Sequence, residues 1–334
     1  MPWRRWCFAV LLWCAGTALL MAQQAPAAAQ NYQDLIHQAE QFMQEKQYPK
    51  AADVLRDAMA LDPKNSVAYY DNACLLSLVG KPVDALHFLK DAVQRGYLDL
   101  PHINSDPDLV NLRKLPAFQE YMEELTPKPD LRIPQDYDKS RSYPLLVFLH
   151  GAQSNPAEFR DFLEAELMDT EYFILCPPGG LLITTTTYTW NPATDTERIL
   201  KCIDATVAKY NIDRSRIYLG GFSAGAVMTY VVGLQNPGRF AGLLPCSGAL
   251  QQQYLTPELL KAAQAVPVFM IQGTQDDAGL VRLAQATLKT LRDNGNPALL
   301  YPFEGGHVLP VPFYDVFVQA MMFLNQHRAV SAAK

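Results

Sequence analysis

Short apolar, β-prone runs alternate with helical segments throughout the second half of the chain. The first run, 143–150, is continuously apolar, which is typical of a strand buried on both faces. Strict alternation predicts a mainly parallel, doubly wound sheet, with reactive groups at the carboxyl ends of its strands. We therefore expect an α/β domain over 127–334. The predicted strands are 143–150, 172–176, 216–221, 242–247, 266–273 and 298–303, and the predicted helices are 157–168, 195–210, 224–234, 256–265, 279–293 and 313–326.

The first half of the chain has a helical period instead. Residues 35–65 place small and apolar side chains at helical intervals, and residues 68–97 repeat the pattern 34 positions later, so that Ala39 matches Ala73. This pattern resembles the tetratricopeptide repeat, in which small residues let two helices approach closely. It predicts an all-α domain over 31–126, closed by the helical segment 105–125. The domain either binds a peptide or protein partner in a groove or acts as a structural cap.

The proline-rich stretch 126–134 is the expected domain boundary. The opening of the chain has the layout of a secretory signal peptide: two arginines, an apolar stretch from Trp6 to Met21, and then small and polar residues. We expect residues 1–22 to be removed, with cleavage as late as residue 29, and the protein to be exported. The alternative is a retained anchor, for which the apolar stretch is short. No later segment is long and apolar enough to span a bilayer.

The net charge of −6 gives no electrostatic reason to expect nucleic acid or anionic membranes as partners. Beyond the leader, the four cysteines contain no CxxC pair, so no zinc cluster is expected. Export would permit a disulfide, but the spacing does not indicate which pair would form it. These cysteines are Cys74, Cys176, Cys202 and Cys246.

The segment 221–225 reads Gly-Phe-Ser-Ala-Gly, a G-x-S-x-G pattern between a predicted strand and a predicted helix. A serine on such a sharp turn has its hydroxyl exposed, and it needs a base that a third group orients. His307, on a glycine-rich loop after the last strand, is the predicted base for Ser223. The acid should follow strand 266–273, where Asp276 is preferred and Asp277 is the reserve.

An oxyanion hole requires backbone N–H groups at the reacting carbonyl. We expect these from Ala224, directly after the serine, and from Ala152 in the loop after the first strand. The polar loop 181–194 carries Tyr188 and Trp190, which either line a substrate pocket or pack the loop down. It leaves no room for a large lid, which favours an open site for small or extended esters.

The stretches "YPLLVFLHG", "IDRSRIYLGGFSAGAVMTY", "GTQDD" and "GGH" resemble the α/β-hydrolase superfamily over about residues 128–328. Within it they are most similar to compact carboxylesterases, acyl-thioesterases and polyhydroxybutyrate-depolymerase-like secreted esterases. The resemblance implies a cofactor-independent hydrolase with an acyl-enzyme intermediate, in which Ser223 attacks an ester carbonyl, His307 moves the proton and Asp276 fixes the imidazole. Gln272 stands where such esterases often carry a histidine, a departure expected not to affect the triad.

Two other functions compete with this interpretation. Peptidases of the prolyl-oligopeptidase type have similar "YPLLVFLHG"-like stretches, although a propeller domain usually precedes them. Alternatively, the helical repeats perform the function as a scaffold, and the hydrolase domain is degenerate. The expected partners are a small-molecule or polymeric ester and a peptide or protein bound by the repeats.

Overall fold

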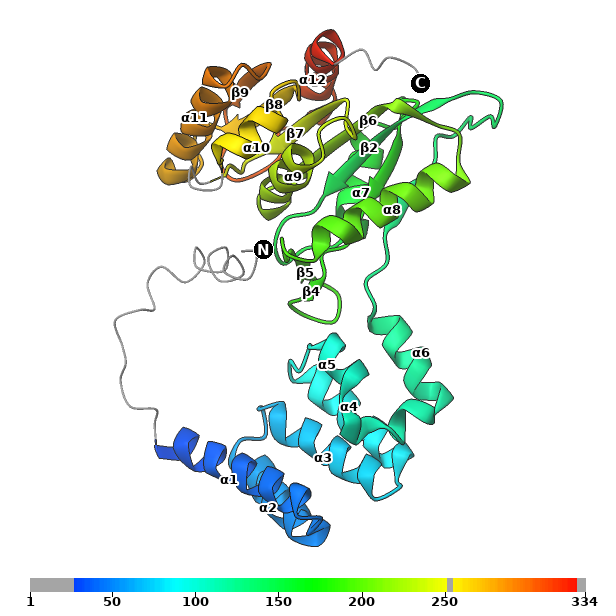
Figure 1. Ribbon diagram of the computed structural model, residues 1–334, viewed down its shortest axis with the longest axis vertical. Helices are drawn as coiled ribbons and strands as arrows, with labels where there is room; N and C mark the ends of the chain where they lie inside the picture. Colours follow the sequence, from blue (N-terminus) through cyan, green and yellow to red (C-terminus); the bar gives the residue numbers. More distant parts are fainter. Residues whose placement is uncertain (1–26, 251–254, 329–334) are drawn as a thin grey trace. The chain divides into compact units, whose positions relative to one another are not determined.

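The computed structural model describes residues 27–250 and 255–328 (Figure 1). The chain divides into two compact units. One comprises the chain up to Thr126 together with Leu182–Thr185, and the other runs from Pro127 to Leu181 and from Thr186 onward. We call them the helical unit and the hydrolase unit. The predicted signal peptide, 1–22, lies outside the described residues. Among the helices that are described, none combines the length and apolar character that crossing a membrane requires.

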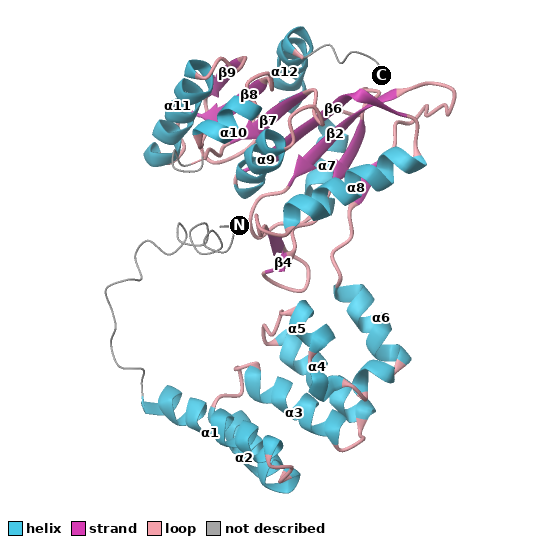
Figure 2. Cartoon of the chain, viewed as in Figure 1, coloured by secondary structure: helices cyan, strands magenta, loops and turns pink. Residues whose placement is uncertain are grey.

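The helical unit consists of paired helices, as its period predicts (Figure 2). Helix α1 packs on α2 and α3 packs on α4. The repeated alanines, among them Ala39, Ala51, Ala73 and Ala85, have no exposed surface, which is how the helices come close together. The elements are α1 (Ala27–Gln44), α2 (Tyr48–Leu61), α3 (Val67–Leu78), α4 (Pro82–Gln94), α5 (Leu100–Ser105) and α6 (Pro116–Leu125), with 3₁₀ turns at Pro107–Leu109 and Leu112–Lys114.

The hydrolase unit contains a seven-stranded sheet in the order β1-β3-β2-β6-β7-β8-β9. All neighbouring pairs are parallel except β1 with β3. The sheet is therefore mainly parallel, which confirms the predicted fold class. Its strands are β1 (Asp130–Arg132), β2 (Tyr143–Leu149), β3 (Phe173–Cys176), β6 (Ile212–Phe222), β7 (Gly242–Cys246), β8 (Val268–Gly273) and β9 (Ala298–Phe303), and β4 (Leu181–Leu182) pairs with β5 (Tyr188–Thr189) apart from it.

Helices cover both faces of this sheet, and each face has its own hydrophobic core. Strand β2 shows why its sequence is continuously apolar: Leu145 and Val147 enter one core while Leu146 and Phe148 enter the other. Helices α8 (Asp195–Lys209), α9 (Ala224–Gln235), α10 (Pro257–Ala262) and α11 (Ala278–Asp293) supply the first core, and α7 (Pro156–Glu166) and α12 (Phe313–His327) supply the second.

Two short elements were not expected. Strand β1 lies inside the proline-rich stretch assigned to the boundary, and it adds an antiparallel edge to the sheet through pairing with β3. The β4–β5 pair lies inside the polar loop predicted as irregular. The four cysteines beyond the leader, Cys74, Cys176, Cys202 and Cys246, are all free thiols.

Candidate active site

Ser223 occupies a strained turn between β6 and α9. Its φ of 55° and ψ of −115° lie outside the regions that ordinary residues prefer. A Cβ on Gly225 would come within 2.1 Å of the Leu149 carbonyl oxygen, and one on Gly221 within 2.5 Å of the Gly225 carbonyl oxygen. The flanking glycines are therefore required by backbone packing, as the G-x-S-x-G pattern implies.

Ser223, His307 and Asp276 lie in hydrogen-bond contact. His307 Nε2 is 2.8 Å from Ser223 Oγ, and His307 Nδ1 is 2.9 Å from Asp276 Oδ2. The three residues follow β6, β9 and β8, so they meet at the carboxyl edge of the parallel sheet. The Asp276 side chain is 2% exposed and that of His307 is 40% exposed. A buried carboxylate thus supports an imidazole that substrate can reach.

The two neighbouring aspartates have separate roles. Asp276 faces His307, whereas Asp277 accepts hydrogen bonds from Gly279 N at 2.8 Å and Leu280 N at 3.2 Å. Asp277 is therefore the N-cap of α11, which satisfies amides that the helix leaves unpaired. The structure brings the preferred residue of the pair to the imidazole, and uses the reserve residue as a cap.

Gln272 contacts the triad, which the sequence analysis did not expect. This residue is 3% exposed, and its Nε2 donates to Asp276 Oδ2 at 2.9 Å. The expectation that the departure at Gln272 does not affect the triad is wrong, because its amide shares the carboxylate oxygen that faces His307. Its place at the end of β8, four residues before Asp276, was the available signal.

The expected oxyanion donors belong to two segments that pack together, because a Cβ on Gly151 would lie 3.1 Å from the Phe222 ring. Ala224 begins α9, and Ala152 lies in the loop after β2. Among the described residues, neither amide N–H has a hydrogen-bond acceptor. Both are therefore available to an anionic oxygen formed beside Ser223 Oγ.

His150 anchors the loop that carries Ala152. It has no exposed surface; its Nδ1 lies 2.7 Å from the Gly151 carbonyl oxygen, and its Nε2 accepts from Gly179 N at 3.0 Å. Burial lowers the pKa of His150 to about 4, partly offset by the Gly151 carbonyl. At neutral pH the ring is uncharged, with Nδ1 as the donor and Nε2 as the acceptor.

Trp190 and Tyr188 hold the same loop from the other side. Trp190 is 7% exposed, and its Nε1 donates to the His150 carbonyl oxygen at 2.8 Å. The backbone of Tyr188 accepts from Gln153 N at 3.0 Å and donates to the Ser154 carbonyl oxygen at 2.8 Å. These contacts match the alternative in which the two residues pack the polar loop down.

Asp195 closes the base of that polar loop, and the sequence analysis missed it. It has no exposed surface, and its Oδ2 accepts from Gly180 N at 2.9 Å and from Asn191 N at 2.7 Å. Arg198 Nε donates to Oδ1 at 3.2 Å. One carboxylate therefore ties together both ends of the segment that carries Tyr188 and Trp190. Only the fold reveals this, because Asp195 reads in sequence as an ordinary first-turn helical acid.

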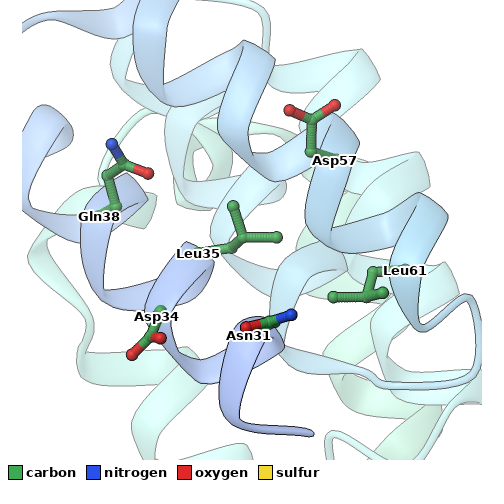
Figure 3. A pocket seen from close by; sticks show the side chains of 6 residues that line it. All are labelled: Asn31, Asp34, Leu35, Gln38, Asp57 and Leu61. Carbon is green, nitrogen blue, oxygen red and sulfur yellow. The ribbon is translucent and has the colours of Figure 1, made fainter. Parts of the chain in front are cut away.

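The helical unit has a surface depression of about 480 Å³ on α1 and α2 (Figure 3). Its lining contains two carboxylates but no serine, cysteine or histidine, so it offers no nucleophile or base. Among the described residues, no group of three or more histidine, cysteine, aspartate or glutamate side chains is placed to hold a metal ion. The lining residues are Asn31, Asp34, Leu35, Gln38, Asp57 and Leu61.

A strained serine with a histidine and a buried aspartate, at the carboxyl edge of a doubly wound sheet, defines an α/β-hydrolase domain with a site of the serine-hydrolase type. Comparison with known proteins agrees. The phospholipase/carboxylesterase family model matches residues 192–327, and the BD-FAE family model matches residues 130–244. The chain therefore carries a domain of the α/β-hydrolase fold that is similar to carboxylesterases.

Several curated proteins are similar to part of the chain. A bifunctional acetylxylan esterase/xylanase of Neocallimastix patriciarum is 32% identical over 183 residues, which are 53% of this chain and 26% of that protein. Acyl-protein thioesterase 1 of Schizosaccharomyces pombe is 35% identical over 105 residues, 31% of this chain and 46% of that protein. The chain thus spans between about a quarter and a half of these relatives.

A solved structure of an uncharacterized protein from Bacillus cereus is similar in fold. The match has a TM-score of 0.51 at 19% identity, and it covers 88% of this chain and 99% of that one. At this identity the likeness supports the fold alone.

Proposed function

We propose that the hydrolase unit is a serine esterase that cleaves carboxylic esters through an acyl-enzyme intermediate. One observation carries the proposal: a continuous hydrogen-bonded series from Ser223 Oγ through both ring nitrogens of His307 to Asp276, with separations of 2.8 and 2.9 Å. A serine hydroxyl is a poor nucleophile without such a base, and the buried carboxylate stabilises the imidazolium that forms.

In the acylation step, His307 Nε2 takes the proton from Ser223 Oγ as this oxygen attacks the ester carbonyl. The N–H groups of Ala224 and Ala152 stabilise the resulting oxyanion, each donor contributing on the order of 3 kcal/mol. His307 then protonates the departing alkoxide, and an alcohol leaves. In the second step, His307 takes a proton from water as the water oxygen attacks the acyl-serine carbonyl. His307 then returns this proton to Ser223 Oγ as the bond to the acyl group breaks, which releases the carboxylic acid and regenerates the free serine.

The substrate we propose is a small or extended ester, including an acyl group on a polysaccharide. The support is the similarity to the acetylxylan esterase/xylanase over 53% of this chain, together with a site whose imidazole is 40% exposed. Acetylated xylan and p-nitrophenyl acetate are therefore the first substrates to compare. Interfacial activation, or preference for long-chain triglycerides over short p-nitrophenyl esters, would contradict an open site.

Labelling with a fluorophosphonate probe tests the mechanism. The parent protein should label and should hydrolyse p-nitrophenyl butyrate, and Ser223→Ala should abolish both. Ser215→Ala is the matched control, because Ser215 is an exposed serine in β6 whose hydroxyl donates to Asp213 Oδ1 at 2.6 Å. The Ser215→Ala variant should label like the parent protein.

Faster turnover of prolyl anilides than of esters would favour the peptidase alternative. A parent protein that does not label would favour the scaffold.

We also propose that the protein is exported after removal of residues 1–22, and that the helical unit binds a peptide or protein partner. Mass spectrometry of protein recovered from the cell exterior or periplasm would test export. A mature chain beginning between residues 23 and 30 supports it, and an intact N-terminus would contradict it. Because the four cysteines beyond the leader are free thiols in the fold, we expect no disulfide among them after export.

A further inference from the structure

The side chain of Gln272 bridges the end of β8 to the acid of the triad. Its Nε2 donates to Asp276 Oδ2 at 2.9 Å, and the same oxygen lies 2.9 Å from His307 Nδ1. The backbone N–H of Asp277 donates to the other oxygen, Asp276 Oδ1, at 2.7 Å. The carboxylate therefore has one protein anchor on each oxygen, and together they fix the plane that it presents to the imidazole.

This arrangement leaves half of the Gln272 amide unsatisfied. Within the described residues, its Oε1 is buried and has no hydrogen-bond partner. Buried polar atoms in folded proteins almost always have partners, so the exception requires a reason. Turning the amide over would set Oε1 against a carboxylate oxygen, acceptor against acceptor, which is repulsive. The orientation thus retains the donor for Asp276 and leaves the acceptor unpaired.

We propose that Gln272 is a positioning residue for the Asp276–His307 pair. Its N–H group stops the carboxylate from rotating, which keeps His307 Nδ1 bonded to Asp276 and His307 Nε2 directed at Ser223 Oγ. The kinetic consequence rests on the proposed esterase function. The hydrogen-bond geometry does not, and it can be tested without catalysis.

Few of the described side chains around Gln272 and the Asp276–His307 pair carry a charge. His307 faces Asp276 from the loop after β9, and the Asp277 carboxylate caps α11. From β7 comes Cys246, a buried thiol whose pKa burial raises, so it stays neutral. The register partner of Gln272 on β9 is Pro302, which carries no charge. A carboxyl introduced at position 272 would therefore interact chiefly with Asp276 and His307.

The first test is Gln272→Met, which keeps the length of the side chain but removes the donor. With p-nitrophenyl acetate, kcat should fall about tenfold while KM stays unchanged, because ground-state binding does not involve Gln272. The matched control is Gln264→Met. Gln264 is exposed and donates to the Asn294 carbonyl oxygen at 2.8 Å, and it precedes β8, whereas Asp276 follows the other end of that strand. It should retain the parent kcat.

The second test is Gln272→Glu, read as a pH profile. Two carboxyl groups in one buried site hold a shared proton at low pH, and a protonated carboxyl donates an O–H bond as the amide does. The ratio of variant to parent kcat/KM should therefore rise as the pH falls. A residue that only fills space would give a ratio independent of pH.

Proton NMR gives a readout independent of turnover. The hydrogen-bonded Nδ1 proton of His307 should appear downfield, be absent in His307→Gln, and shift or broaden in Gln272→Met. If the parent protein neither labels nor hydrolyses esters, the esterase function fails, and this resonance still tests Gln272. If esters are hydrolysed while Gln272→Met keeps the parent kcat and the parent resonance, the positioning role is overturned and the esterase stands.

Discussion

The helical unit and the hydrolase unit each bury an ionisable side chain, but they treat it differently. In the hydrolase unit, His150 has no exposed surface, and both of its ring nitrogens have hydrogen-bond partners. In the helical unit, Asp71 on α3 is 9% exposed, and its Oδ2 has no partner among the described residues. Burial lowers the pKa of His150 to about 4 and raises that of Asp71 to about 7.

The same physical penalty, loss of hydration, gives these opposite pKa shifts because histidine is neutral when deprotonated, whereas aspartate is neutral when protonated.

The units also differ in their backbone conformations. The hydrolase unit holds a serine at a φ of 55° between close-packed glycines, whereas Gly80 in the helical unit has a φ of 76° with no atom within 4 Å of its Cβ position. A positive φ at a serine among closely packed glycines therefore marks the site, whereas a positive φ at a glycine in open space marks an ordinary helix end.

Substituting a glycine in each unit gives the largest expected contrast. Gly225→Ala places a Cβ 2.1 Å from the Leu149 carbonyl oxygen, so we expect a loss of more than about 3 kcal/mol in the free energy of unfolding. Fluorophosphonate labelling should also be lost. Gly80→Ala meets no atom but keeps an unfavourable φ, so it should cost about 1 kcal/mol and leave labelling intact.

Urea denaturation and labelling of both full-length variants measure this contrast. Equal stability losses in the two variants, or a Gly225→Ala protein that still labels, would contradict the account of the serine turn.

The predictable parts of the molecule are those with a repeating local signal. The strand and helix segments of the hydrolase unit lie close to their predicted ranges, because each apolar run is bounded by turn residues. Strand β1, Asp130–Arg132, was not predicted because three residues are too few to show a hydrophobic period. Its formation also depends on pairing with β3, in which the partner of Asp130 is Cys176, 46 positions away. Such pairings are properties of the fold and are not visible in a local window.

The candidate site shows the same limit. Ser223, His307 and Asp276 could be predicted because each residue type is required by the chemistry and each follows a strand. Asp195 and the buried His150 hold the neighbouring loops through Gly180 and Gly179, contacts that no local window reveals, whereas Gln272 contacts Asp276 only four positions away. A glutamine at the end of a strand has no chemical signature until the neighbouring carboxylate is located.

Opposite pH responses of the two units are the next largest effect. Below its unfolded-state pKa of roughly 6.5, unfolded His150 binds a proton that the folded ring does not bind until about pH 4. The unfolded state thus binds more protons in this window, and stability falls as the pH falls through it, by on the order of 3 kcal/mol.

Asp71 has the reverse sign. The folded carboxyl keeps its proton up to about pH 7, and its unfolded form loses it near pH 4, so stability falls as the pH rises through this window. Glu40, Asp106 and Asp108 add to the upward shift after burial. Hydrogen exchange of the full chain should show α3 losing protection from pH 4.5 to 7 while β2 gains it. Asp71→Asn should flatten the α3 response, and parallel responses in both units would refute the contrast.

Removing one buried donor from each unit separates stability from activity. Trp190→Phe deletes the N–H that bonds the His150 carbonyl oxygen at 2.8 Å, and Tyr70→Phe deletes the hydroxyl that bonds Asp106 Oδ2 at 2.6 Å. Each removes a buried donor and should cost about 1–3 kcal/mol, although Asp106 Oδ2 keeps the Cys74 thiol as a weaker donor at 3.5 Å.

Only Trp190→Phe should slow labelling, by about tenfold, because the His150 loop carries the Ala152 amide. Thermal unfolding and the labelling rate are the two measurements. Two results would contradict the view that Trp190 holds the loop that carries Ala152. One is a Tyr70→Phe protein that labels slowly, and the other is a Trp190→Phe protein that labels at the parent rate.

The smallest effect concerns helix caps, which occur in both units and should behave alike. Asp277 caps α11 through Gly279 N, and Asp99 caps α5 through His102 N at 2.9 Å. Replacing either by alanine should cost about 1 kcal/mol. Asp277→Ala should still label at the parent rate, because its contact with Asp276 is made by its backbone N–H, which alanine retains. Asp276→Ala should label far more slowly. The comparison of these two adjacent aspartates therefore distinguishes a residue required for the helix cap from one required for the chemistry. Equal losses of labelling in Asp276→Ala and Asp277→Ala would show instead that the two carboxylates act together.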